Sequence, residues 1–197
     1  MNRAVFLDRD GVINQKPSEG DYVTRWEDFH ILPGVPEGVA LLHRAGFSVI
    51  VVTNQRCIAK GLMTVVELEN MHQKMTEHLA GSGAIIEGTF YCPHEIEPVC
   101  ECRKPAPGML LEAARLHGID LSTSWMIGDS DIDIQAGKNA GCKTVRLMAG
   151  EEAPAQRASA STTQADITSR SFLEAIRRIF EREGVSVDSF STTPATI

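Results

Sequence analysis

The stretch Ala4-Val5-Phe6-Leu7-Asp8-Arg9-Asp10-Gly11 decides the fold class that we expect for this chain. Its apolar half has the length of a buried parallel strand and ends in two aspartates and a glycine, which lets the chain turn. Ligands of open α/β sheets bind at the carboxyl ends of the strands, so carboxylates placed there point to chemistry. By itself the pair also fits a solvated acidic turn, and residues further along must decide between the two.

The rest of the chain repeats the alternation of strand and helix. Apolar, β-branched runs predict further strands over 47–52, 88–91, 124–128 and 143–148. Helical spacing and caps predict helices over 35–45, from Thr64, from Pro107 to Gly118, over 131–140 and from Ser171 to Gly184. This order predicts an α/β fold of three layers with a central parallel sheet and right-handed crossovers.

Composition limits the domain count and the partners. The 197 residues suit one domain, which we place at 1–183, with a flexible tail over 184–197. The net charge of -7 and the lack of a Lys/Arg block argue against nucleic acid or a membrane surface as partner. No run approaches the ~20 apolar residues of a membrane span, so we expect a cytoplasmic protein, and we expect a monomer.

Two segments lack a periodic pattern. Residues 11–33 form a long flap that leaves the first strand beside the aspartates, and loops of this length are usually functional. Residues 150–164 shift to Ala, Ser, Thr, Pro and Glu and predict a mobile surface excursion. No segment is large enough for a cap domain, so only the flap and the loop over 92–104 can cover the predicted ligand-binding edge of the sheet.

Four polar clusters fall on the predicted ligand-binding edge. They are Asp8 with Asp10, Thr53-Asn54, Arg103-Lys104 and Asp129. Each alone fits a strand end, a solvated loop or an acidic helix start. Together they supply what phosphoryl transfer requires: an in-line nucleophile, positive charge for the phosphate oxygens and a group that handles the leaving-group proton.

The roles follow from the chemistry of each side chain. Asp8 is the candidate nucleophile, and Asp10 the candidate acid that protonates the leaving alcohol and then activates water. Hard oxygen ligands from Asp8, Asp129 and a backbone oxygen near Asp10 predict a catalytic Mg²⁺. Lys104 and the Thr53 hydroxyl are expected to stabilise the transferred phosphoryl group.

A second constellation predicts a structural Zn²⁺. Cys92, His94, Cys100 and Cys102 offer three thiolates and one imidazole, a full tetrahedral set with no open position. The loop over 92–104 then continues directly into Arg103-Lys104, so the metal would staple the phosphate-binding lysine in place. The lone cysteines and the histidines within predicted helices, His72 among them, have an ordinary structural interpretation.

These motifs, together with Gly128-Asp129-x-x-x-Asp133, resemble the haloacid-dehalogenase (HAD) superfamily of phosphatases over about positions 3–150. The resemblance implies a Rossmann-like fold and an aspartyl-phosphate mechanism. The zinc loop running into Cys102-Arg103-Lys104-Pro105 resembles the branch of histidinol phosphatases and heptose-bisphosphate phosphatases. The resemblance to that branch implies substrate contacts from Asn54, Gln55, Arg56 and Arg103.

Three functions are compatible with the sequence. The Pro-Gly-Met-Leu run at 107–110 and the basic residues favour hydrolysis of the 7-phosphate of a heptose 1,7-bisphosphate, a small phosphorylated sugar made for surface polysaccharide. The short loop between His94 and Cys100 is typical of histidinol phosphatases. A catalytically inactive, zinc-stapled binding module is the third, and intact Asp8 and Asp10 argue against it.

Overall fold

The computed structural model of the chain describes residues 2–148 and 163–186. They contain a six-stranded, fully parallel sheet in the order β3-β2-β1-β4-β5-β6. The strands are β1 Arg3–Leu7, β2 Phe47–Asn54, β3 Gly88–Cys92, β4 Trp125–Gly128, β5 Lys143–Leu147 and β6 Ile167–Ser169. The predicted parallel α/β fold is confirmed, and the strand order reverses at β1, which carries the two aspartates at its end.

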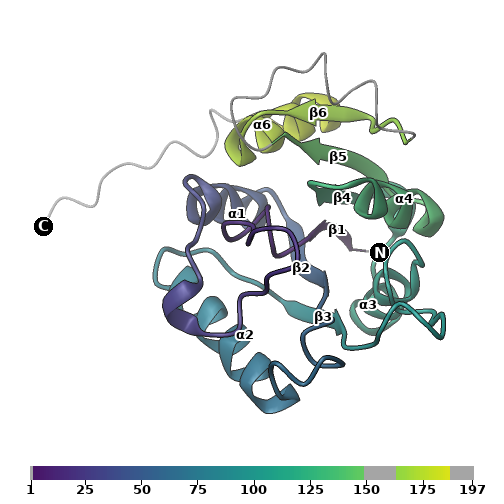
Figure 1. The fold of residues 1–197 in the computed structure, drawn as a ribbon. Coiled ribbons are helices and arrows are strands. Elements are labelled where there is room, and N and C mark those ends of the chain that lie inside the picture. The colour runs from purple at the N-terminus through teal and green to yellow at the C-terminus, as the bar shows by residue number, and fades with distance from the viewer. Residues whose placement is uncertain (1, 149–162, 187–197) are drawn as a thin grey trace, which may run out of the picture.

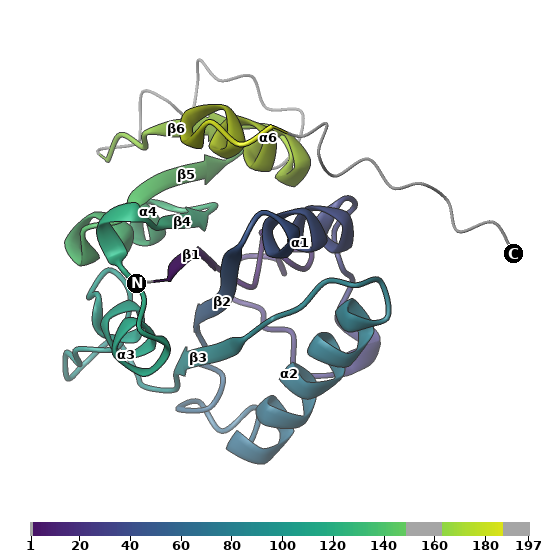
Figure 2. The ribbon, with the colours of Figure 1, turned by 180° about the vertical axis from the view of Figure 1, so that it is seen from behind.

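Helices cover both faces of the sheet (Figures 1 and 2). Three of them, α1 Val35–Arg44, α2 Val65–Ala80 and α6 Phe172–Glu183, pack on one face, while α3 Gly108–His117 and α4 Asp131–Ala140 pack on the other. The alternation along β1 explains the two cores: Val5 and Leu7 face one, and Ala4 and Phe6 face the other. All four side chains are fully buried.

Local sequence signals account for most helix ends. Thr64 accepts a hydrogen bond from the Glu67 amide while the Glu67 side chain accepts one from the Thr64 amide, the predicted capping box of α2. A second capping box, Ser130 with Asp133, opens α4. The predicted helices and strands agree with the structure to within one or two residues.

β6 and two 3₁₀ turns, η1 Trp26–Asp28 and η2 Leu121–Thr123, are absent from the sequence prediction. β6 has only three residues, too few for a period of two, and it exists because it pairs with β5 at the edge of the sheet. The predicted excursion over 150–164 and the predicted tail over 184–197 lie largely outside the described residues.

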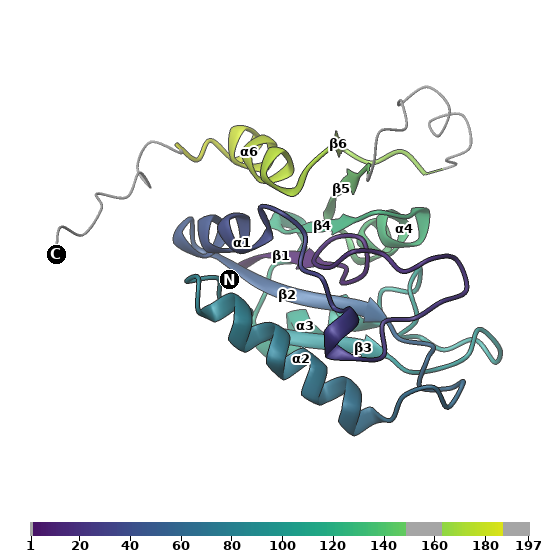
Figure 3. The same cartoon turned by 60° about the vertical axis from the view of Figure 1, so that its left-hand side comes forward.

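The flap over 11–33 is anchored to the protein, although most of its residues between 15 and 30 are exposed. The Gln15 amide donates to the His30 carbonyl and the Leu32 amide to the Ile13 carbonyl, both over 2.8 Å, so the two ends of the flap pair. Val23 and Phe29 are buried in the core shared with α1 and α2. Figure 3 shows the flap, in purple, beside the carboxyl ends of the strands, with the loop after β3 at the same edge.

Among the described residues, none of the helices combines the length and apolar character needed to cross a bilayer.

Candidate active site

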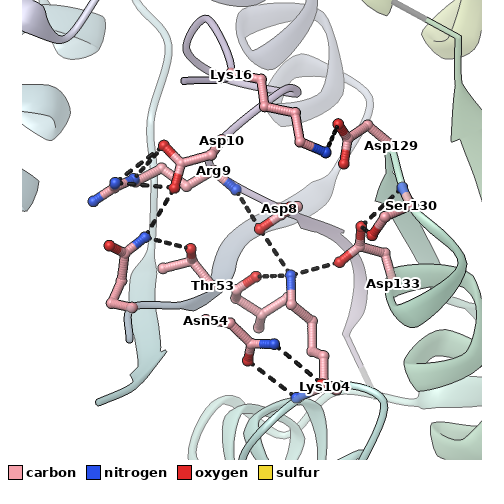
Figure 4. Close-up of polar contacts among 12 residues, drawn as sticks. Asp8, Arg9, Asp10, Lys16, Thr53, Asn54, Lys104, Asp129, Ser130 and Asp133 are labelled. Carbon is pink, nitrogen blue, oxygen red and sulfur yellow. Dashed lines mark hydrogen bonds and ion pairs between the residues drawn. The ribbon is translucent and has the colours of Figure 1, made fainter. Parts of the chain in front are cut away.

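A buried lysine lies between two aspartates at the carboxyl edge of the sheet (Figure 4). Nζ of Lys104 is 2.7 Å from Oδ1 of Asp8, at the end of β1, and 2.6 Å from Oδ1 of Asp133, in the first turn of α4. It also donates to the Val52 carbonyl of β2 over 2.9 Å. Lys104 is 2% exposed and Asp133 is fully buried, so this charge network is shielded from water.

The end of β2 positions this lysine and a hydroxyl. The Asn54 side chain accepts from the Lys104 amide and donates to the Lys104 carbonyl, each over 3.1 Å, which fixes the backbone of the loop after β3. The Thr53 hydroxyl is buried and accepts from Nε2 of Gln55 over 2.8 Å.

Asp10 is oriented by three neighbours. The guanidinium of Arg9 forks onto its carboxylate, with Nη2 3.0 Å from both oxygens. Asn14 donates to Oδ1 over 2.9 Å, and Nε2 of Gln55 donates to Oδ2 over 3.0 Å. Burial alone would raise the pKa of Asp10, but Arg9 and these hydrogen bonds outweigh it and lower the pKa.

Asp129, at the end of β4, completes the edge and meets the flap. Nζ of Lys16 lies 2.6 Å from its Oδ2. Gly11 makes this approach possible: its φ is +93°, and a Cβ there would lie 2.4 Å from Oδ2 of Asp129. At Gly128 a Cβ would lie 2.0 Å from Cβ of Asp133, so both carboxylates occupy space that only glycine leaves open.

The electrostatics of this edge favour a bound cation. Oxygens of Asp8, Asp129 and Asp133 lie within 4.8 Å of one another. Burial, followed by repulsion from Asp133, raises the pKa of Asp8 to about 7 against the pull of Lys104. Burial also raises the pKa of Asp129, although Lys16 opposes it. A hard divalent cation suits such clustered carboxylates.

A second cluster begins at Cys92, the last residue of β3, and continues in the loop that follows. Sγ of Cys92 is 3.6 Å from Sγ of Cys100, Sγ of Cys100 is 3.5 Å from Sγ of Cys102, and Nδ1 of His94 is 3.2 Å from Sγ of Cys102. All four ligand atoms lie within 4.8 Å of one another. A tetrahedron of thiolates about 2.3 Å from a zinc ion has edges of ~3.8 Å, so the set fits such an ion.

The two basic residues predicted to contact the substrate are engaged by the loop over 92–104. Nε of Arg56 lies 2.6 Å from Oε2 of Glu95, and Nη1 of Arg103 donates to the His94 carbonyl over 3.2 Å. The structure thus groups Asp8, Asp10, Thr53, Asn54, Gln55, Lys104 and Asp129 at one edge, with Arg56 and Arg103 tied to the adjoining loop.

Sequence reasoning assigned no role to Asp133, Lys16, Asn14 or Arg9. Asp133 had a signal, since it closes the Gly128-Asp129-x-x-x-Asp133 pattern at the third position of a helix. For Lys16 and Asn14 the only sequence signal was their position in a flap that directly follows the aspartates. Arg9 had no sequence signal, because residue spacing at the end of a strand does not show which side chain turns inward.

Comparisons with known proteins place this geometry in a family. The model of the HAD-hydrolase-like family matches residues 101–175. A curated relative from Pseudomonas aeruginosa is 39% identical over 152 residues, covering 77% of this chain and 84% of the relative. A relative from Escherichia coli K12 is 40% identical over 152 residues, covering 74% and 78%. The chain belongs to the HAD-like hydrolases.

Both of those relatives are named D-glycero-beta-D-manno-heptose-1,7-bisphosphate 7-phosphatase. A solved structure agrees with them: the D,D-heptose 1,7-bisphosphate phosphatase of Bordetella bronchiseptica, complexed with magnesium and phosphate, superposes with a TM-score of 0.80. It is 30% identical, and the match covers 91% of this chain and 99% of that one.

Proposed function

We propose that this chain is a Mg²⁺-dependent phosphatase that hydrolyses the 7-phosphate of D-glycero-D-manno-heptose 1,7-bisphosphate, in the synthesis of nucleotide-activated heptose. The observation that carries the proposal is the buried group of Asp8, Lys104 and Asp133, with Asp10 and Asp129 beside it. The names of the relatives supply the substrate.

In the first step, an oxygen of Asp8 attacks phosphorus in line with the leaving sugar alcohol, and the Asp8–phosphorus bond forms as the phosphorus–oxygen ester bond breaks. Lys104 and the Thr53 hydroxyl bind the phosphoryl oxygens, whose negative charge they stabilise. Asp10 gives its proton to the departing sugar oxygen. The charge of the bound phosphate raises the pKa of Asp10 and so favours the protonated form that this step requires.

In the second step, the ionised Asp10 takes a proton from water. That water attacks the phosphorus of the aspartyl-phosphate, which releases inorganic phosphate and restores the Asp8 carboxylate. The fork from Arg9 and the donors on Asn14 and Gln55 stabilise the ionised form that acts as base.

Asp8, Asp129 and the backbone oxygen of Asp10 would hold Mg²⁺, which supplies positive charge against the carboxylate and phosphate oxygens. Asp133 then orients Lys104, to which it is ion-paired at 2.6 Å. Lys16, 55% exposed along its side chain, can leave Asp129 when the cation binds.

The cluster of Cys92, His94, Cys100 and Cys102 would hold a structural Zn²⁺. Four protein ligands leave no place for water, so the ion fixes the loop instead of entering the reaction. The last ligand, Cys102, stands two residues before Lys104, so the zinc site limits how far the phosphate-binding lysine can move.

Arg56 and Arg103 would bind the sugar and its second phosphate. The second phosphate of a bisphosphate offers negative charge to both, and the Arg56 side chain is 31% exposed beside Glu95. A single domain over 1–183, a monomer and a cytoplasmic location are part of the same proposal.

The test is phosphate release, with Mg²⁺, from both anomers of heptose 1,7-bisphosphate and from histidinol phosphate, measured side by side. We expect kcat/KM for one heptose anomer to exceed that for histidinol phosphate by at least about 10²-fold, the range a lost charged contact produces. A higher kcat/KM for histidinol phosphate would contradict the proposed substrate.

Histidinol phosphatase is the second candidate. Its substrate carries an ammonium group, which calls for an acid near the phosphate site, and Glu95 is such an acid. Arg56 already pairs with Glu95 through Nε, so an ammonium group would have to displace the guanidinium from this carboxylate, which a phosphate need not do. In the assay above, Arg56→Ala should raise KM for heptose bisphosphate, and a fall in KM for histidinol phosphate would support the second candidate instead.

A further inference from the structure

Arg9 stands between the two catalytic aspartates in sequence, yet its side chain is fully buried. All three guanidinium nitrogens are engaged inside the protein. Nε and Nη2 donate to the Asp10 carboxylate over 3.2 and 3.0 Å. Nη1 lies 3.3 Å from Nε2 of His72 and 3.8 Å from Sδ of Met71. The guanidinium is therefore committed to internal contacts and is not placed to bind a phosphate from solvent.

The contact with His72 fixes the protonation of that ring. A guanidinium can only donate, so Nε2 of His72 must accept, and the neutral ring carries its proton on Nδ1. Burial, together with the charge of Arg9, lowers the pKa of His72 to about 3, in keeping with a neutral acceptor. His72 lies on α2, which is packed into the core by Leu68, Met75 and Leu79.

These contacts form a chain from α2 to the carboxylate of Asp10. Two parallel hydrogen bonds from a planar guanidinium fix the plane of a carboxylate as well as its position. Proton transfer requires the acid to lie within hydrogen-bond reach of the leaving oxygen. An Asp10 released from the fork could rotate about its side-chain bonds and lose that reach.

We propose that Arg9 and His72 are positioning residues for the general acid: His72 holds the Arg9 guanidinium, whose fork aims the Asp10 carboxylate at the leaving oxygen. This inference rests on the proposed function, because it assumes that Asp10 protonates the leaving alcohol.

The leaving group provides the readout. In a reaction with a phosphoenzyme, kcat/KM covers the steps up to departure of the first product. A sugar alkoxide needs protonation to leave, whereas p-nitrophenolate leaves readily without it. A misplaced acid should therefore reduce kcat/KM for the sugar phosphate much more than for p-nitrophenyl phosphate, while a merely structural loss would reduce both by the same factor.

Arg9→Met keeps the bulk of the side chain but removes the fork onto Asp10. His72→Leu removes the hydrogen-bond acceptor for Arg9, and His72→Gln retains one. For Arg9→Met we expect kcat/KM to fall about 10²-fold on heptose bisphosphate and less than ~10-fold on p-nitrophenyl phosphate. His72→Leu should give the same pattern with smaller losses, and His72→Gln should retain most of the wild-type kcat/KM on heptose bisphosphate. Met75→Leu, a buried change on the same helix, should leave the ratio of the two substrates unchanged.

Equal losses on both substrates, in Arg9→Met or in His72→Leu, would overturn the inference. If Arg9→Met does not fold, the two His72 variants decide the question alone. A wild-type protein without activity on heptose bisphosphate would contradict the proposed function instead, and the ratio of an accepted alkyl phosphate to p-nitrophenyl phosphate would still test Arg9.

Discussion

Three buried charges, Asp8, Lys104 and Asp133, depend on one another. Lys104 touches both carboxylates, and the two aspartates raise its pKa despite the opposing effect of burial. Breaking a buried ion pair from one side is costly because the remaining charge is left without a partner in a poorly solvating place. The same contacts that stabilise this edge of the sheet would also position Asp8 for the proposed attack on phosphorus.

Lys104→Met should therefore reduce both stability and activity. We expect the free energy of unfolding to fall by about 3–5 kcal/mol and phosphate release to slow by at least ~10²-fold. Chemical denaturation and a phosphate assay measure the two effects. The double variant Lys104→Met with Asp133→Asn should regain part of the stability but none of the activity, and recovery of activity would contradict a role for the lysine charge.

His72 predicts a specific pH dependence of stability. Its pKa is about 3 in the folded protein and about 6.5 in the unfolded chain. Below about pH 6.5 the unfolded chain takes up a proton that the folded protein does not, so stability falls with decreasing pH, by at most about 1.4 kcal/mol per pH unit.

At pH 5 this amounts to about 2 kcal/mol lost relative to pH 7. His72→Gln should lose correspondingly less over the same interval in denaturant titrations, since the carboxylates titrate alike in both proteins. Identical pH profiles for the two proteins would show that His72 is not held neutral.

Residue types and spacing predicted the location of most of the candidate site. Asp8, Thr53, Lys104 and Asp129 follow predicted strands or a loop between them, and parallel strands bring those ends together. Spacing could not show that Lys104 would pair with Asp133, nor that Lys16 would reach Asp129 from the flap. Those contacts depend on side-chain directions that only the packed structure defines.

At the scale of single elements, the loop after β3 joins the two candidate metal sites. It contains three of the four candidate zinc ligands, the fourth being Cys92 at the end of β3, and it ends in Arg103-Lys104. Asn54 of β2 clamps its backbone at Lys104. Without the metal, three thiols and an imidazole would be left to hold this turn by weak contacts alone.

Metal analysis of the purified protein should find about one zinc per chain. A chelator selective for Zn²⁺ over Mg²⁺ should lower both the melting temperature and phosphate release, and added Zn²⁺ should restore them. Cys57→Ser, which alters a buried cysteine outside the cluster, is the matched control for Cys100→Ser. A Cys100→Ser protein with full zinc content would contradict the assignment of that ligand.

The elements themselves were predictable where a pattern was long enough. Helices such as α2 carry both a cap and an apolar face, and the central strands are continuous apolar runs. β6 is too short for any such pattern and forms only by pairing with β5. The flap is aperiodic, so the sequence could give its length but not its packing against the core.

At the scale of the whole molecule, a parallel sheet brings distant segments to one edge. The candidate nucleophile Asp8 directly follows β1, the Thr53 hydroxyl lies on β2, and Lys104 lies in the loop after β3. Of the other carboxylates, Asp129 directly follows β4 and Asp133 lies on α4. The flap and the loop over 92–104 border that edge, and among the described residues no larger element covers it. Such a site suits a small phosphorylated metabolite.

In the proposed reaction the phosphoryl group passes through Asp8. The most direct test of this step is acid quenching during the first turnover on heptose 1,7-bisphosphate with Mg²⁺, followed by peptide mass spectrometry. We predict a phosphoryl group on Asp8. With p-nitrophenyl phosphate, whose leaving group needs no acid, the amount should be larger in an Asp10→Asn protein, because only its second step is slow. Wild-type turnover by Asp8→Asn, or a phosphoryl group found on another residue, would contradict the account.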